Sequence, residues 1–462
     1  MRHCTISFLF APLLFIGHLC FAQPAQDGQL ARDLDQLIAG RLADIAPGCA
    51  VLVTKKGRTV YKKGFGYANL ELRVPTKPDM VFRIGSVTKQ YTAIAILQLV
   101  EQGKIALRDS FQKFIPSFPY KGHTITIENL LTHTSGVVDY EVLDAHIPNA
   151  IRIEFPAKYV VDSLANYPLE FTPGAKYHYS NSNYFLLGQI IEAVSGKSYQ
   201  EYLQENIFQK AGLKNTYYDS PTQLIPNRVN GYTKYDGVFQ NAGYISMSLV
   251  YSAGALLSNT EDLYKWHQAL YSYKLVKKET LEKAFTPFKL ADGRLSEYGY
   301  GWFIRMRNNA QSIEHSGGID GFQSDEIYFP EQDIFIATLY NSLNDGGNDL
   351  SFMALDNDIC LLALGQKLKK AIQVDSKDLA EFVGVYESDP EHSATITLEN
   401  GQLQFEASGG GVPKSPLFSK SENNFFLKII DADIEFVRDK DRKVTELIVT
   451  FQGQKQVAKK VK

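Results

Sequence analysis

The amino-acid pattern changes at residues 367–377, and this change limits the folds open to the chain. Before this polar segment, apolar residues recur at helical spacing in some stretches and in strand-like runs in others. After it, short strand-like stretches alternate with turn residues, including the hairpin-forming pair Asn400-Gly401. The sequence therefore predicts an α/β unit at residues 23–366, a linker at 367–377 and a small antiparallel β-barrel or sandwich at 378–462.

The first unit is expected to have an outer α/β layer around a helical, loop-rich insert at about residues 107–250. Helical spacing of apolar residues predicts helices at about 29–45, 87–101 and 349–364. Strand signals lie at 49–54, 59–63, 299–306, 312–315, 323–329 and 334–341. In the second unit, strands are expected at 382–386, 394–398, 402–406, 424–430, 433–437 and 444–451.

The N-terminus has the pattern of a secretory signal peptide. A short positive head, Met1–His3, precedes an apolar stretch at 6–21 that ends in small residues at Ala22. A membrane anchor is disfavoured because Pro12, Gly17 and His18 interrupt the stretch, and a lipid-modified Cys20 has a poor surrounding sequence. We therefore expect residues 1–22 to be removed and the protein to be exported, to the periplasm or outside the cell.

Charge and cysteine content exclude several functions. The chain has 48 Lys and Arg against 51 Asp and Glu, with no long run of one sign, which argues against a nucleic-acid-binding protein. No later stretch is long and apolar enough to span a membrane. No motif has metal-ligand spacing, so no metal or other cofactor is expected. Beyond the leader only Cys49 and Cys360 remain, and free thiols are favoured over a bridge between them.

The first candidate for chemistry is Ser86 with Lys89. At the start of a helix, this spacing places a hydroxyl and an amine on one face, one turn apart. The alternative role for Ser86 is a helix cap, which the tetrapeptide by itself favours. The same spacing recurs at Ser110 and Lys113, in a polar turn where it looks accidental.

Two further candidates come later in the chain. Tyr179 precedes a helix and Asn181 follows two residues later, so a phenol and an amide can reach one cleft. The alternative is that both side chains have only a packing or surface role. His315 is followed by Ser316-Gly317-Gly318 at the end of a short strand. Glycines there allow a substrate close to the backbone, and a free N–H can face a developing oxyanion. The alternative for His315 is a tight turn.

These signals occur in the order SxxK, YxN and HxG, and together they resemble the serine β-lactamase and penicillin-recognising hydrolase superfamily, nearest its class C-like branch (peptidase family S12). Flanking phrases also fit this resemblance: Pro47-Gly48, Leu130–Gly136, Ser252-Ala253-Gly254 and Tyr300-Gly301-Trp302. The resemblance covers about residues 29–364 and implies an α/β sandwich with a helical subdomain and the active site between them. The tail resembles the lipocalin-like barrel of some of these enzymes.

The resemblance implies acyl transfer through an acyl-enzyme. Ser86 is the expected nucleophile, Lys89 and Tyr179 share the proton transfers, and which of them is the base stays open. Asn181 orients Lys89 or the substrate, and the N–H groups of Ser86 and Gly318 form the oxyanion hole, beside Gly317.

The sequence departs from the pattern of this superfamily at His315, and this departure bears on the substrate. Penicillin-converting members usually carry Lys at this position. A mostly neutral His does not attract a substrate carboxylate in the way that a charged Lys does. This favours a D-amino-acid peptidase or esterase acting on a small molecule or short peptide. The alternatives are a β-lactamase or D-Ala-D-Ala carboxypeptidase and, in another class, a non-catalytic ligand-binding or scaffold protein. The oligomeric state is left open.

Overall fold

The computed structural model describes residues 22–42, 46–344, 350–374, 379–389, 392–408, 412–451 and 454–462. The predicted signal peptide lies outside the described residues except for Ala22, which begins helix α1 (Ala22–Ala39). This helix ends before Gly40, earlier than the predicted end at 45, because glycine is a poor helix former; the Gly40 N–H still makes a helical bond to Gln36 O.

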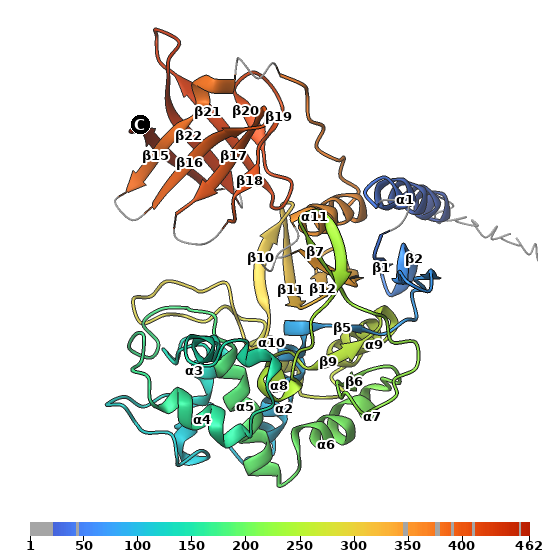
Figure 1. Ribbon diagram of the computed structural model, residues 1–462, viewed down its shortest axis with the longest axis vertical. Helices are drawn as coiled ribbons and strands as arrows, with labels where there is room; N and C mark the ends of the chain where they lie inside the picture. The colour runs from blue at the N-terminus through green and yellow to red at the C-terminus, as the bar shows by residue number, and fades with distance from the viewer. Residues whose placement is uncertain are drawn as a thin grey trace, which may run out of the picture.

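A six-stranded antiparallel sheet forms the centre of the first unit, in the order β10-β11-β12-β13-β1-β2. Its strands are β1 (Cys49–Lys55), β2 (Arg58–Phe65), β10 (Phe303–Arg307), β11 (Ala310–Ile319), β12 (Phe322–Phe329) and β13 (Ile334–Tyr340). Alternate side chains of β1 face two different cores, since Val51 packs with α1 and α11 (Leu350–Ala363) while Leu52 packs with the helical subdomain. The sheet is therefore covered on both faces, as Figure 1 shows.

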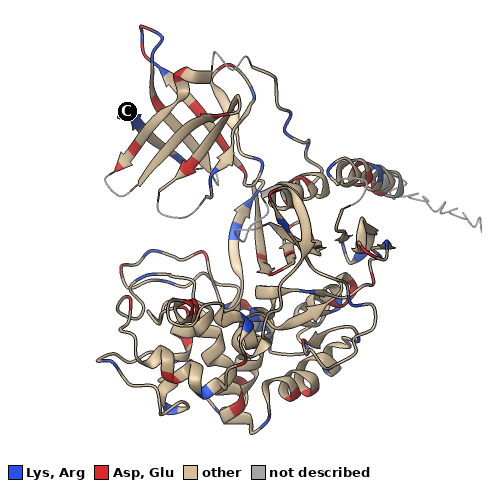
Figure 2. Cartoon of the chain, viewed as in Figure 1, with Lys and Arg blue, Asp and Glu red and all other residues tan. Residues whose placement is uncertain are grey.

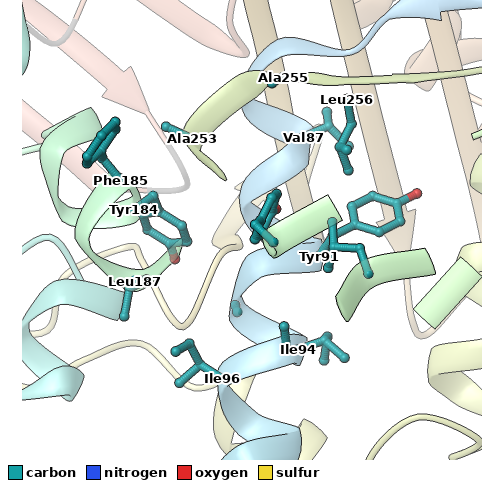
Figure 3. Packing of buried hydrophobic residues seen from close by; sticks show 14 of the residues in the cluster. Val87, Tyr91, Ile94, Ile96, Tyr184, Phe185, Leu187, Ala253, Ala255 and Leu256 are labelled. Atoms are coloured by element: carbon teal, nitrogen blue, oxygen red, sulfur yellow. The ribbon is translucent and has the colours of Figure 1, made fainter. Parts of the chain in front are cut away.

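The helical subdomain surrounds helix α2 (Thr88–Glu101), which is buried along most of its length. Figure 3 shows Tyr91, Ile94 and Ile96 of α2 packed among residues of neighbouring elements. Helix α2 contacts α5 (Asn181–Ser195), α6 (Tyr199–Leu203) and α8 (Met247–Gly254). The other helices of the subdomain are α3 (Ile127–Leu131), α4 (Ala157–Ala165), α7 (Gln209–Ala211), α9 (Thr260–Tyr271) and α10 (Lys278–Ala284). Single turns of helix also occur, η1 (Gly85–Val87), η2 (Phe111–Lys113), η3 (Tyr140–Ala145), η4 (Ala150–Arg152) and η5 (Gln204–Phe208). An all-round apolar helix of this kind must be buried, as the sequence predicts.

Short strands complete this unit. They form the sheets β5-β9-β6, β14-β7-β8 and β3-β4. Their bounds are β3 (Tyr67–Asn69), β4 (Val74–Pro75), β5 (Phe82–Arg83), β6 (Tyr217–Tyr218), β7 (Tyr232–Tyr235), β8 (Val238–Asn241), β9 (Leu256–Ser258) and β14 (Ser342–Asn344). Strand β5 leads almost directly into η1, so the pairing of β5 with β9 fixes where that turn begins.

The C-terminal unit is a nearly closed antiparallel barrel, in the order β18-β17-β16-β15-β23-β22-β21-β20-β19. After the turn η6 (Ala380–Phe382) come β15 (Gly384–Asp389), β16 (His392–Glu399), β17 (Gln402–Ala407), β18 (Ser415–Pro416), β19 (Phe418–Ser419), β20 (Asn424–Phe426), β21 (Ala432–Arg438), β22 (Val444–Phe451) and β23 (Gln454–Lys460). Only Leu417 separates β18 from β19, the two ends of the strand order, so the sheet almost closes on itself. The α/β fold and the antiparallel barrel expected from the sequence are both confirmed.

The barrel lies beside β10 and α11 in Figure 1. Ala354 of α11 belongs to the barrel's apolar core, and Lys369 of the connecting segment bonds to Asp431 at 2.7 Å. Figure 2 shows acidic and basic residues mixed over both units. Among the described residues no helix is long and apolar enough to cross a membrane, and Cys49 and Cys360 are buried free thiols.

Candidate active site

Ser86 lies in η1, at the entrance to α2, with its side chain partly exposed. No side chain caps either helix, so Ser86 does not take the capping role considered above. Its Oγ instead receives hydrogen bonds from Lys89 Nζ and from Tyr179 OH, each at 2.9 Å. Residues from α2 and from the loop before α5 thus meet at one hydroxyl.

Lys89 is fully buried, and burial is the main cause of its altered pKa. Its Nζ donates to Ser86 Oγ, to Asn181 Oδ1 at 2.8 Å and to the carbonyl of Ala253 at 2.9 Å. Desolvation lowers the pKa of Lys89 to about 7, against a smaller opposing effect of the Asp139 carboxylate. Near neutral pH the amine is therefore poised between its charged and neutral forms.

The pKa of Tyr179 shifts in the opposite direction to that of Lys89. Desolvation holds its pKa well above the usual value of a phenol, although the hydrogen bond to Ser86 lowers it somewhat. The His133 ring stacks on the Tyr179 ring with 4.3 Å between centroids. His133 Nδ1 accepts from the Ser180 N–H at 3.2 Å, so this histidine holds the loop that carries Tyr179. Tyr179 stays a protonated donor toward Ser86.

Asn181 binds the amine, which is one of the two roles considered for it. Its own backbone N–H donates to the Asp139 carboxylate, which caps η3. Asp139 was not singled out from the sequence, where an Asp before a short helix looks like an ordinary cap. Here it also supplies the charge that opposes the fall in the pKa of Lys89.

A strained residue positions the Ala253 carbonyl. Tyr251, within α8, has φ 42° and ψ −130°, a conformation that costs a non-glycine residue about 1–3 kcal/mol. Ser252 Oγ donates to the Tyr184 carbonyl at 2.8 Å, which ties this bend to α5. A Cβ on Gly188 of α5 would lie 2.1 Å from that Oγ, so glycine is required for the close approach.

Gly318 lies on an open edge of β11. The strand pairs with β12 around the two-residue loop 320–321, with Ile319 opposite Phe322. Hydrogen-bonded and non-bonded pairs alternate along antiparallel strands, and the pair that closes such a loop is bonded. The N–H of Gly318 therefore points away from β12, toward the edge that β10 leaves open because it pairs only with residues 310–314.

The backbone of Ser86 packs against this edge. A Cβ on Gly317 would lie 2.1 Å from Ile84 O and 2.9 Å from Ser86 N, and a Cβ on Gly85 would lie 3.0 Å from Gly318 N. Gly85 also has φ +47°, which favours glycine. Glycine is therefore needed at position 317 because two backbones approach closely there, beside the candidate nucleophile Ser86.

His315 is 1% exposed. Its Nδ1 lies 2.6 Å from the Ser316 carbonyl, so Nδ1 carries the proton and Nε2 accepts from Tyr298 OH at 2.9 Å. Burial and the nearby Lys89 lower the pKa of His315 to about 3, so the ring is neutral. Tyr298 was not identified from the sequence, because nothing local marks its contact with His315.

The second serine–lysine spacing does not form a site. Ser110 Oγ bonds to Gln112, and Lys113 instead lies 3.6 Å from Asp109. Among the described residues there is no cluster of three or more His, Cys, Asp or Glu suited to a metal ion. Of the two serine–lysine spacings, the one at Ser86 therefore brings a hydroxyl and an amine together.

Fold and site together have the form of a serine hydrolase with a buried lysine beside its nucleophile. The beta-lactamase family model matches residues 34–355, and a domain of unknown function (DUF3471) matches residues 368–460. The chain belongs to the beta-lactamase family, in the superfamily of serine β-lactamases and transpeptidases.

Relatives and solved structures are consistent with this family assignment. Penicillin-binding protein 4* of Bacillus subtilis (strain 168) is 30% identical over 423 residues, which are 85% of this chain and 90% of that protein. The octameric penicillin-binding protein homologue from Pyrococcus abyssi has a TM-score of 0.64 at 27% identity, covering 94% of this chain and 99% of that one. A D-amino acid amidase from Ochrobactrum anthropi SV3 shares the fold, with a TM-score of 0.64 at 23% identity over 74% of this chain and 98% of that one.

Proposed function

We propose that this protein is an exported serine hydrolase that cleaves a small peptide, amide or ester through an acyl-enzyme on Ser86. The observation that carries the proposal is the pair of 2.9 Å hydrogen bonds that Lys89 and Tyr179 make to Ser86 Oγ. A nucleophile and a base within hydrogen-bond reach, with the base held by other groups, is the arrangement that activates a serine.

Lys89 is the favoured base in this proposal. With a pKa of about 7, its neutral form is available at neutral pH, whereas removing the Tyr179 proton is disfavoured by burial. Ser86 Oγ attacks the carbonyl carbon and its proton passes to Lys89, directly or through Tyr179 OH. The leaving group takes a proton back as its bond to the carbonyl breaks, and water then hydrolyses the ester of Ser86.

The backbone N–H groups of Ser86 and Gly318 are the proposed oxyanion donors. They come from two elements that pack in contact, and the N–H of Gly318 is not used by β12. Two such donors, fixed before the reaction, stabilise the charge that develops on the carbonyl oxygen.

The neutral His315 bears on the choice of substrate. A ring with a pKa of about 3 supplies no fixed positive charge for a substrate carboxylate. This supports a peptidase or esterase over the alternative of a β-lactamase or D-Ala-D-Ala carboxypeptidase. Relatives named as penicillin-binding proteins nevertheless make β-lactams useful covalent probes.

The test is active-site labelling of the full chain. A fluorophosphonate and a fluorescent penicillin are each incubated with wild type and with Ser86→Ala, and the labelled peptide is identified by mass spectrometry. We expect fluorophosphonate on the peptide that contains Ser86 and none on Ser86→Ala. Absence of label from folded wild type would favour the non-catalytic ligand-binding alternative, and label on another serine would move the site.

A further inference from the structure

The barrel encloses one side of an apolar cavity of about 430 Å³. On the barrel side, its wall includes Phe405, Leu427, Leu447 and Ala458, all of them buried. This volume falls in the range of about 300–1000 Å³ that is typical of pockets for small molecules. A cavity of this size among apolar side chains is suited to an aliphatic group.

The other side of the cavity belongs to the hydrolase unit, where β10 and β11 contribute Arg305, Arg307 and Glu314. Arg305 bonds to Glu297 at 3.0 Å, and Arg307 bonds to Glu314 at 3.2 Å. Because both guanidinium groups already face carboxylates, this wall does not select strongly for an anion.

The cavity adjoins the strand that borders Ser86. A second cavity, of about 110 Å³, is lined by Ser316, Gly317 and Gly318. The two cavities share Arg305, Arg307, Glu314 and Ile429 as lining residues. Gly317 and Gly318 of the second cavity also pack against the turn that carries Ser86, so the lining residues run from the barrel cavity to the strand beside the candidate nucleophile.

We propose that the apolar cavity between the barrel and β10 binds the aliphatic chain of an amphipathic ester or amide whose carbonyl lies at Ser86. The proposal rests on the proposed function of Ser86, and it narrows the substrate class to molecules with a long acyl chain. The barrel is then part of the substrate site and not only an appended domain.

Side chains of β23 alternate between the inside and the outside of the barrel, which allows a matched pair of variants. Ala458 points into the cavity, whereas its neighbour Val457 is exposed on the outside of the barrel. Ala458→Trp fills the cavity, and Val457→Trp adds the same bulk outside it. Ala407→Phe, at a half-buried lining position, serves as a second filling variant if Ala458→Trp does not fold.

The experiment measures kcat/KM of the full chain for p-nitrophenyl octanoate and p-nitrophenyl acetate. Burial of each methylene gives about a fourfold gain, so we expect the octanoate to acetate ratio in wild type to exceed about 100. In Ala458→Trp or Ala407→Phe the ratio should fall at least tenfold, and in Val457→Trp it should match wild type. A flat wild-type ratio, or an equal loss in Val457→Trp, would overturn the proposal.

Equilibrium binding separates this proposal from that for Ser86. Dansyl-labelled undecanoic acid is titrated into Ser86→Ala and into the double variant Ser86→Ala/Ala458→Trp. We expect binding to the first that weakens at least tenfold in the second. No ester hydrolysis, together with this binding pattern, would overturn the proposed hydrolase while supporting the cavity as a ligand site. No binding to Ser86→Ala would overturn the cavity proposal.

Discussion

At the scale of single residues, the site depends on two ionisable groups whose pKa values are moved apart by the same cause. Burial disfavours the charged form of each, so it lowers the pKa of Lys89 to about 7 and raises that of Tyr179 well above its usual value. Near neutral pH, part of the Lys89 amine is therefore neutral beside a protonated phenol at Ser86. This is the condition for one group to accept a proton while the other donates one.

Replacement of Ser86 should remove catalysis without loss of the fold. Ser86→Ala should reduce hydrolysis of p-nitrophenyl acetate by at least about 1000-fold, because the hydroxyl is the proposed nucleophile. The melting temperature should stay close to that of wild type, since the side chain is partly exposed and caps no helix. Ser110→Ala, in the second serine–lysine spacing, is the matched control and should keep full activity. Near wild-type rates in Ser86→Ala would place the nucleophile elsewhere.

The pH dependence of kcat/KM should report the pKa of Lys89. Below pH 7 the amine is protonated and cannot accept the Ser86 proton, so the rate should rise about tenfold per unit and level off above a midpoint of about 7. Tyr179→Phe should lower kcat about 100-fold while a midpoint near 7 remains. Lys89→Ala should lower kcat similarly, and the double variant should lose less than the product of the two because they act together. A midpoint near 10 in wild type would contradict the lowered pKa of Lys89, because an ordinary lysine titrates there.

At the scale of elements, the site depends on how closely η1 packs against β11. Both backbones come together at Gly85 and Gly317, where no Cβ fits without a shift. The proposed oxyanion donors are on these two elements, so their spacing is set by this packing and not by either element alone. The bend at Tyr251 likewise sets the position of the Ala253 carbonyl, which accepts a hydrogen bond from Lys89.

Gly317→Ala should therefore impair catalysis through displacement of η1. The added methyl would meet the backbone at Ile84 O, 2.1 Å away, and backbone cannot move aside as a flexible side chain can. We expect kcat for p-nitrophenyl acetate to fall about 100-fold, since a displacement of about 1 Å at reacting groups costs that much. Gly28→Ala, in α1 with Arg32 Nη1 3.7 Å away, should leave kcat unchanged. Equal rates for both variants would show that this contact does not set the oxyanion geometry.

At the scale of the whole molecule, the two units have largely separate apolar cores. The barrel core contains Ala354 of α11 and otherwise buried residues from the strands and loops of 379–458. Ionic contacts such as that of Lys369 with Asp431 hold the connecting segment to the barrel. The units therefore share a boundary near the candidate site without sharing one core.

A truncated chain of residues 23–366 should consequently fold and hydrolyse p-nitrophenyl acetate. Its melting temperature should fall by a few degrees, because loss of the barrel exposes Ala354 and the outer side of β10. The octanoate to acetate ratio should drop at least tenfold, as in the cavity-filling variants. Circular dichroism and steady-state kinetics on the truncated chain test these expectations. An insoluble product would show that the hydrolase unit needs the barrel to fold.

Local residue patterns were enough to predict the helices α1, α2 and α11, the six strands of the central sheet, six of the nine barrel strands and the three motifs that meet at the site. Periodicity and turn residues act over a few positions, so they can be read without knowledge of the fold. Among the barrel strands, β18, β19 and β23 were not predicted, and the longest of them, β23 (Gln454–Lys460), was missed because its residues are polar or exposed except Ala458. Its strand state comes from pairing with β15 and β22.

The remaining features arise only from contacts between distant parts of the chain. Asp139, Tyr298 and the Ala253 carbonyl have no local signal, since each acts through a partner far away in the sequence. The pKa of Lys89 is likewise a property of burial, which depends on every element packed around α2. Residue types and spacing indicate which groups can react, whereas desolvation and backbone approach, which need the assembled fold, decide their protonation and their geometry.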